Sequence, residues 1–162
     1  MYPKNVFKMV VIVLLSLVMF IPVAQAEQTY DFTYCGSWAM TLMSDSKELR
    51  VYSFDGKGIV MSNQKDKIFD NCSFHGVGVR RTMGDKVNAY GYWKLMDADG
   101  DYVVMEVTTV GTDTTTKFLV GVGKWKGITG SGKIAQGIRA KGITSDTSQN
   151  CGRATGTFKL KK

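Results

Sequence analysis

Apolar and polar residues alternate with a period of two along most of the chain, which is the pattern of strands with one buried face. The clearest examples are Val87–Met96 (VNAYGYWKLM) and Tyr102–Val110 (YVVMEVTTV), which flank the turn-forming segment Asp97–Asp101 (DADGD). Other strand-like stretches are Thr33–Met43, Leu49–Phe54, Gly58–Ser62, Cys72–Thr82, Lys117–Val122, Ile134–Thr144 and Arg153–Leu160. No stretch long enough for three helical turns has a 3.6-residue period. The chain is therefore predicted to be all-β, with eight or nine short strands.

The spacing of these stretches favours a single closed antiparallel β-barrel of about eight strands, with a β-sandwich as the alternative. Glycines inside the strands support the barrel, because glycine relieves crowding where a strand bends or bulges. An eight-stranded barrel has an interior just wide enough for side chains or one small ligand. Asp55-Gly56-Lys57, which separates two apolar runs, also predicts a hairpin turn.

Residues 1–26 have the three parts of a secretory signal. Lys4 and Lys8 are followed by the apolar stretch Met9–Val23 and by Ala24-Gln25-Ala26, a small-x-small cleavage site. The apolar stretch is shorter than the ~20 residues of a membrane span, so an uncleaved anchor is the weaker interpretation. We therefore expect cleavage near Ala26 and a periplasmic or secreted barrel domain at 27–162, with no membrane span in the mature protein.

The net charge of +7 falls to +5 once the two lysines of the signal are removed. The remaining basic residues are spread along the chain. A nucleic-acid-binding surface would gather them in one stripe with stacking aromatic residues. Nucleic acid is therefore not an expected partner.

The export signal makes a disulfide expected, since exported proteins meet an oxidising environment. Cys35, Cys72 and Cys151 allow three single pairings, each with one thiol left over. We favour Cys72–Cys151, because each of these two cysteines opens a strand directly after a polar loop. Cys35 is the alternative partner for either one.

The segment Gly121–Gly132 (GVGKWKGITGSG) resembles a glycine-rich segment of the allene oxide cyclase-like and dirigent-like β-barrels, and most resembles uncharacterised secreted bacterial members. The resemblance extends more weakly over Val87–Leu160. It implies a closed barrel with a central cavity, and the plant relatives are often oligomeric, so a homo-oligomer is compatible with it. Those relatives cyclise an allene oxide or steer phenoxy-radical coupling. No match to their active-site residues accompanies the resemblance, so no activity is carried over.

The hairpin of Val87–Met96 and Tyr102–Val110 is the predicted ligand-binding wall, through Tyr90, Tyr92, Trp93 and Glu106. A two-residue turn at Asp99-Gly100 places Trp93 opposite Glu106, and a longer turn slips the pairing and exchanges the faces. Either register sends an aromatic side chain into the barrel. Glu106 is also the candidate catalytic residue, because a carboxyl group within an apolar strand is a common feature of acid–base sites.

The alternating carboxylates of Asp97, Asp99 and Asp101 are a weak candidate for a metal site. The position that carries a glutamate in a calcium-binding loop is Thr108 here, so a solvated turn is the favoured interpretation and no metal is expected. No motif indicates a cofactor.

Three functions remain open on the sequence. The first is binding of a small apolar ligand in the barrel without catalysis. The second is a cyclase or isomerase that uses Glu106. The third is a structural or interaction module of the cell envelope with a filled barrel.

Overall fold

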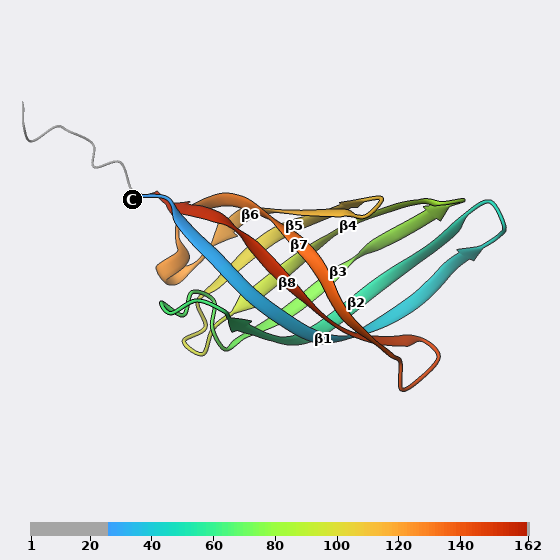
Figure 1. Ribbon diagram of the computed structural model, residues 1–162, viewed down its shortest axis with the longest axis horizontal. Helices are drawn as coiled ribbons and strands as arrows, with labels where there is room; N and C mark the ends of the chain where they lie inside the picture. The colour runs from blue at the N-terminus through green and yellow to red at the C-terminus, as the bar shows by residue number, and fades with distance from the viewer. Residues whose placement is uncertain (1–25, 162) are drawn as a thin grey trace, which may run out of the picture.

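Each strand of the barrel pairs antiparallel with its neighbours in sequence, and the first strand pairs with the last, so the sheet closes on itself (Figure 1). The computed structural model describes residues 26–161, and the predicted signal sequence lies outside the described residues apart from Ala26. The elements are β1 (Gln28–Asp45), β2 (Arg50–Ser62), β3 (Cys72–Met83), β4 (Lys86–Met96), β5 (Tyr102–Val110), β6 (Asp113–Gly121), a 3-10 turn η1 (Gly123–Trp125), β7 (Ile128–Lys141) and β8 (Thr147–Leu160). The predicted closed barrel of eight antiparallel strands is confirmed. Within residues 26–161, no helix has the length and apolarity needed to cross a membrane.

One predicted turn is wrong, because β2 runs without interruption through Asp55-Gly56-Lys57. Gly56 faces the barrel interior, where a Cβ atom would collide with the indole ring of Trp38. Asp55 points outward, and its Oδ1 lies 3.1 Å from Nε2 of His75 on β3. The glycine is therefore required by a neighbouring ring and not by a turn.

One end of the barrel is plugged by two inserted aromatic side chains. The loop of residues 63–71 contributes Phe69, which is 2% exposed, and η1 contributes Trp125. Their rings stack at 4.6 Å between centroids. Tyr30 and Phe158, from β1 and β8, pack against Phe69 from the barrel wall. In Figure 1 this plugged end lies on the left, where the loop between β2 and β3 and the segment between β6 and β7 come together.

The middle of the barrel is filled by aromatic rings that lie over glycines. Trp38, Phe74 and Trp93 form a cluster with centroids 5.5–5.7 Å apart. A Cβ atom on Gly76 would lie 2.8 Å from Cδ1 of Trp93, and one on Gly78 would lie 2.5 Å from Cζ of Phe54. Real Cβ atoms do not approach other heavy atoms this closely, so the rings occupy their positions only because these inward-facing residues have no side chain.

A disulfide between Cys35 and Cys151 joins the outer face of β1 to that of β8. The favoured pairing of Cys72 with Cys151 is therefore wrong. Cys35 and Cys151 lie directly opposite each other at the seam where the first and last strands meet. Cys72 instead points into the plugged end of the barrel as a free thiol. Its burial raises the pKa of Cys72 to about 11, so the thiol stays protonated at neutral pH.

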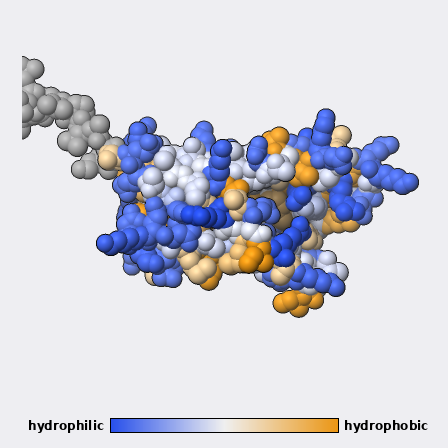
Figure 2. All heavy atoms as spheres, in the orientation of Figure 1, coloured by the Kyte–Doolittle hydropathy of each residue, from blue (hydrophilic) through white to orange (hydrophobic). Residues whose placement is uncertain are grey.

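The face of the barrel seen in Figure 2 is mostly hydrophilic, with scattered hydrophobic patches. Figure 2 shows one such patch at the tip of the β7–β8 hairpin, where Ile143 is 90% exposed.

Substituting Gly76 with alanine is expected to lower the free energy of unfolding by about 1–3 kcal/mol, because the new methyl group overlaps the rings of Trp38 and Trp93. Urea unfolding of the oxidised protein measures this loss. Gly84→Asn is the matched control, since Gly84 has a φ of 54° but open space around it. We expect the control to cost less than about 1 kcal/mol, because asparagine tolerates a left-handed φ. Equal stability of Gly76→Ala and the parent would contradict the packing account.

Peptide mapping under non-reducing conditions should recover Cys35 linked to Cys151 and Cys72 as a free thiol. Replacing both linked cysteines with serine is expected to cost about 2–5 kcal/mol of stability, because the crosslink constrains the two ends of the unfolded barrel sequence. Recovery of a peptide that joins Cys72 to either of the other cysteines would contradict the structure.

Candidate functional site

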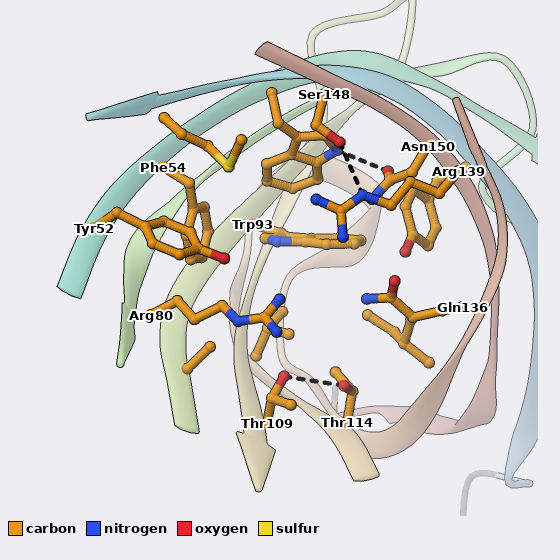
Figure 3. Close-up of a pocket in the computed structure, with 16 residues that line it drawn as sticks. Tyr52, Phe54, Arg80, Trp93, Thr109, Thr114, Gln136, Arg139, Ser148 and Asn150 are labelled. Atoms are coloured by element: carbon orange, nitrogen blue, oxygen red, sulfur yellow. Dashed lines mark hydrogen bonds between the residues drawn. The ribbon is translucent and has the colours of Figure 1, made fainter. Parts of the chain in front are cut away.

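The end of the barrel opposite the plug holds a pocket of about 130 Å³ that opens to solvent (Figure 3). This end carries the four tight hairpin connections at residues 46–49, 84–85, 111–112 and 142–146, and none of the described residues there crosses the opening as a plug. All eight strands contribute to the lining, which consists of Tyr34, Trp38, Met40, Tyr52, Phe54, Arg80, Ala89, Trp93, Val107, Thr109, Thr114, Ile134, Gln136, Arg139, Ser148 and Asn150. The pocket is thus the unfilled remainder of the barrel interior.

The floor of the pocket is aromatic. The rings of Trp38 and Trp93 lie 5.6 Å apart, and Tyr34 meets Trp93 edge-on at 4.8 Å. The indole N–H of Trp38 on β1 donates to Oδ1 of Asn150 on the neighbouring strand β8 at 2.8 Å, which fixes the orientation of the ring. Such a floor offers a rigid apolar surface to a flat or aliphatic molecule.

Polar groups are placed sparsely on the pocket wall. The hydroxyl groups of Thr109 and Thr114 lie 3.0 Å apart on β5 and β6. Gln136 projects from β7, as Figure 3 shows. Burial raises the pKa of Tyr34 to about 12, so its phenol is neutral at ordinary pH and retains a proton to donate. A pocket of this kind holds most of a ligand by contact area and orients it through a few hydrogen bonds.

Two arginines stand on opposite sides of the pocket between the ring layer and the mouth. Arg80 comes from β3 and Arg139 from β7, and Figure 3 shows both guanidinium groups directed into the opening. Nε of Arg139 donates to Oγ of Ser148 at 3.3 Å. The Arg80 guanidinium lies 5.9 Å from the centre of the Tyr52 ring. Beyond them the mouth widens into a hollow of about 460 Å³, lined by Ser46, Lys47, Arg50, Tyr52, Arg80, Thr82, Gly84 and Arg139.

Of the residues predicted to bind a ligand, the structure places only Trp93 in the pocket. The connection between β4 and β5 is longer than two residues, so Tyr92 pairs with Glu106 and Trp93 pairs with Met105. Tyr90, Tyr92 and Glu106 consequently lie together on the outer face of the barrel. The predicted pairing of Trp93 with Glu106 is wrong by one residue, and the alternative register describes the hairpin.

The three outward-facing residues form a hydrogen-bonded chain. Tyr90 donates to Oε2 of Glu106 at 2.7 Å and accepts from the hydroxyl group of Tyr92 at 2.7 Å. The hydrogen bonds from Tyr92 and to Glu106, together with the negative charge of Glu106, raise the pKa of Tyr90. Glu106 is therefore a surface residue with a tyrosine partner and has no access to the pocket.

The aspartates of the β4–β5 connection form hydrogen bonds and an ion pair that stabilise the turn. Oδ1 of Asp97 accepts from the backbone N–H groups of Asp99 and Asp101, each at 3.0 Å. Nζ of Lys124 lies 2.8 Å from Oδ2 of Asp97, and the backbone N–H of Lys124 donates to Asp101. Desolvation acts to raise the pKa of Asp97, but the hydrogen bond and charge of Lys124 lower it overall. A lysine ammonium group thus stands where the candidate metal would be, and residues 26–161 contain no cluster of three or more His, Cys, Asp or Glu fit to hold a metal ion.

Most of the pocket residues were not singled out from the sequence. Trp38, Arg80, Arg139 and Asn150 lie on different strands, and their convergence depends on the register of the whole barrel. The one local signal is the alternation in β3, where Phe74, Gly76, Gly78 and Arg80 share the inward face. When alternate residues of a strand face the barrel interior and the last of them is an arginine, that arginine is expected to point into the barrel.

No protein-family model matches the chain, and no curated protein matches it. The solved structures that are similar to it include two dirigent proteins. The pterocarpan synthase dirigent protein GePTS1 superposes with a TM-score of 0.55 at 10% identity, over 85% of this chain and 93% of that one. The pterocarpan synthase dirigent protein PsPTS1 superposes with a TM-score of 0.52 at 11% identity, over 85% of this chain and 97% of that one. At this level of identity the comparison concerns architecture, and it shows that the chain has the closed eight-stranded barrel fold of the dirigent proteins.

Proposed function

We propose that this chain is an exported barrel protein that binds a small, mostly apolar molecule in the open end of the barrel without transforming it. The observation that carries the proposal is the pocket of about 130 Å³ above the rings of Trp38 and Trp93. An enclosed apolar cavity of about 150 Å³ binds benzene. This pocket is close to that size and is open on one side, so one ring or a short aliphatic group can enter it. The wider mouth has room for the rest of a larger molecule.

The lining supports binding over the two alternatives. Among the described residues that line the pocket there is no aspartate, glutamate, histidine, lysine or cysteine. The hydroxyl groups of Tyr34, Tyr52 and Ser148 therefore have no carboxylate or imidazole among the lining residues to activate them. The cyclase or isomerase hypothesis relied on Glu106, which lies on the outer face. A purely structural module would be expected to fill its whole interior, whereas this barrel is filled at the plugged end and in the middle but not at the open end.

Export is supported by two independent features of the chain. The N-terminal sequence has the order of a cleavable signal, and the Cys35–Cys151 disulfide fits an oxidising compartment.

Replacing Trp93 with alanine is expected to weaken binding of a small neutral aromatic probe at least about tenfold, because the floor of the pocket loses a large contact area. Isothermal titration calorimetry with indole and 4-phenylbutyramide measures the change. Tyr92→Ala is the matched control on the same strand, since Tyr92 points outward and should alter affinity by less than about twofold.

Ala89→Leu provides a second variant that fills the pocket while leaving the ring layer in place. It should abolish binding of both probes with little loss of stability. The binding proposal would be overturned if neither probe, nor any member of a panel of one- and two-ring compounds, produced heat with the parent protein. Equal losses from Trp93→Ala and Tyr92→Ala would overturn the location of the site.

Expression of the full chain in a host with a secretion pathway should yield a mature protein that begins at Glu27. Intact-mass measurement of the protein recovered from the periplasm or medium gives the start directly. A full-length species retained in the membrane fraction would contradict cleavage and export.

A further inference from the structure

The pocket that the proposed function assigns to a ligand has a positively charged entrance. Arg80 and Arg139 face each other across the opening, and Arg50 and Lys47 lie on the rim. Arg50 has a carboxylate partner, with its Nε 2.8 Å from Oδ1 of Asp45. Among the described residues, no aspartate or glutamate lines either the pocket or the mouth, and neither Arg80 nor Arg139 forms an ion pair.

Arg80 is held in a position that leaves its hydrogen-bonding capacity unused. Its Nε atom is shielded from solvent and has no hydrogen-bond partner within the described part of the chain. A buried donor without a partner costs free energy, and the cost is greater for a charged group than for a neutral one. The side chain remains there because it continues the inward face of β3 and lies against the ring of Tyr52.

The two guanidinium groups also repel each other, because both are positively charged and the aromatic floor of the pocket offers no negative group between them. A bound anion would balance the like charges and supply acceptors for the terminal N–H groups that Arg80 and Arg139 direct into the opening. Arginine is suited to this role, since its planar donors match the two oxygens of a carboxylate or the oxygens of a phosphate.

We propose that the natural ligand is an amphipathic anion, with a carboxylate or similar oxyanion held between Arg80 and Arg139 and an apolar body on the rings of Trp38 and Trp93. This inference rests on the proposed function and adds the chemical class of the ligand. Arg80 is the principal contact because its guanidinium group is directed into the opening and has no carboxylate partner among the described residues. Arg139, which is exposed and held by Ser148, closes on the same group from the opposite wall.

A pair of probes that differ only in charge tests the assignment. The carboxylate 4-phenylbutyrate and its neutral amide 4-phenylbutyramide have the same body, so the ratio of their affinities isolates the contribution of the charge. Titration calorimetry at low salt should show that the parent protein binds the carboxylate at least about tenfold more tightly than the amide, the difference typical of a charge-assisted hydrogen bond. Raising the salt concentration should reduce this preference, because salt screens the attraction at the open mouth.

Arg80→Met removes the charge and keeps the length of the side chain. It should lower affinity for the carboxylate about tenfold and change affinity for the amide by less than about twofold, so the preference is lost. Arg81→Met is the matched control, because Arg81 is the next residue on β3, faces outward, and lowers the net charge by the same amount. The control should retain the full preference, and thermal unfolding of both variants confirms that they are folded.

The outcomes separate the two proposals. If both probes bind with equal affinity, the anionic class of the ligand is overturned and the binding function stands. If Arg81→Met reduces the preference for the carboxylate as much as Arg80→Met does, the preference comes from overall charge and the proposed site is overturned. If neither probe binds and the wider panel of compounds also fails, the proposed function itself is overturned.

Discussion

The interior of this barrel depends on the match between large aromatic rings and residues without side chains. A closed barrel of eight strands has limited interior width, and the sequence directs Tyr34, Trp38, Phe54, Phe74 and Trp93 into it. These rings fit because the neighbouring inward positions are glycines such as Gly56, Gly76 and Gly78. A methyl group at any of these positions would overlap a ring or the backbone. A large ring on one strand therefore requires a glycine at the facing position of a neighbouring strand.

This match divides the barrel into a filled part and a hollow part. Phe69 and Trp125 seal one end, and the ring layer forms a rigid partition across the middle. Above the partition the inward side chains are shorter or more polar, so the space is not filled. The pocket consequently has an aromatic floor that is fixed by the fold, and a mouth whose chemistry is set by the residues that end the strands. Basic residues at those ends give the mouth its charge.

The sequence predicts the fold well because strand periodicity and turn residues are local properties. It predicts the hairpin of β4 and β5 but not its register, because the register depends on whether Gly100 closes a turn of two residues or a longer one. A shift of one residue in this register moves Glu106 from the cavity to the surface. The Asp55-Gly56 turn and the Cys72–Cys151 pairing failed for a related reason. A glycine that makes room for Trp38, and a cysteine opposite another across the barrel seam, are specified by residues far away in the chain.

We propose that the ring layer supports a hollow, cation-lined end of the barrel that accepts a small amphipathic anion. A crystal structure of the mature chain soaked with 4-phenylbutyrate would reveal whether this end is occupied. We expect density for the phenyl group on the rings of Trp38 and Trp93 and for the carboxylate within hydrogen-bonding distance of Arg80. An interior filled by the protein's own side chains, or a ligand bound only on the outer face near Tyr90 and Glu106, would contradict it.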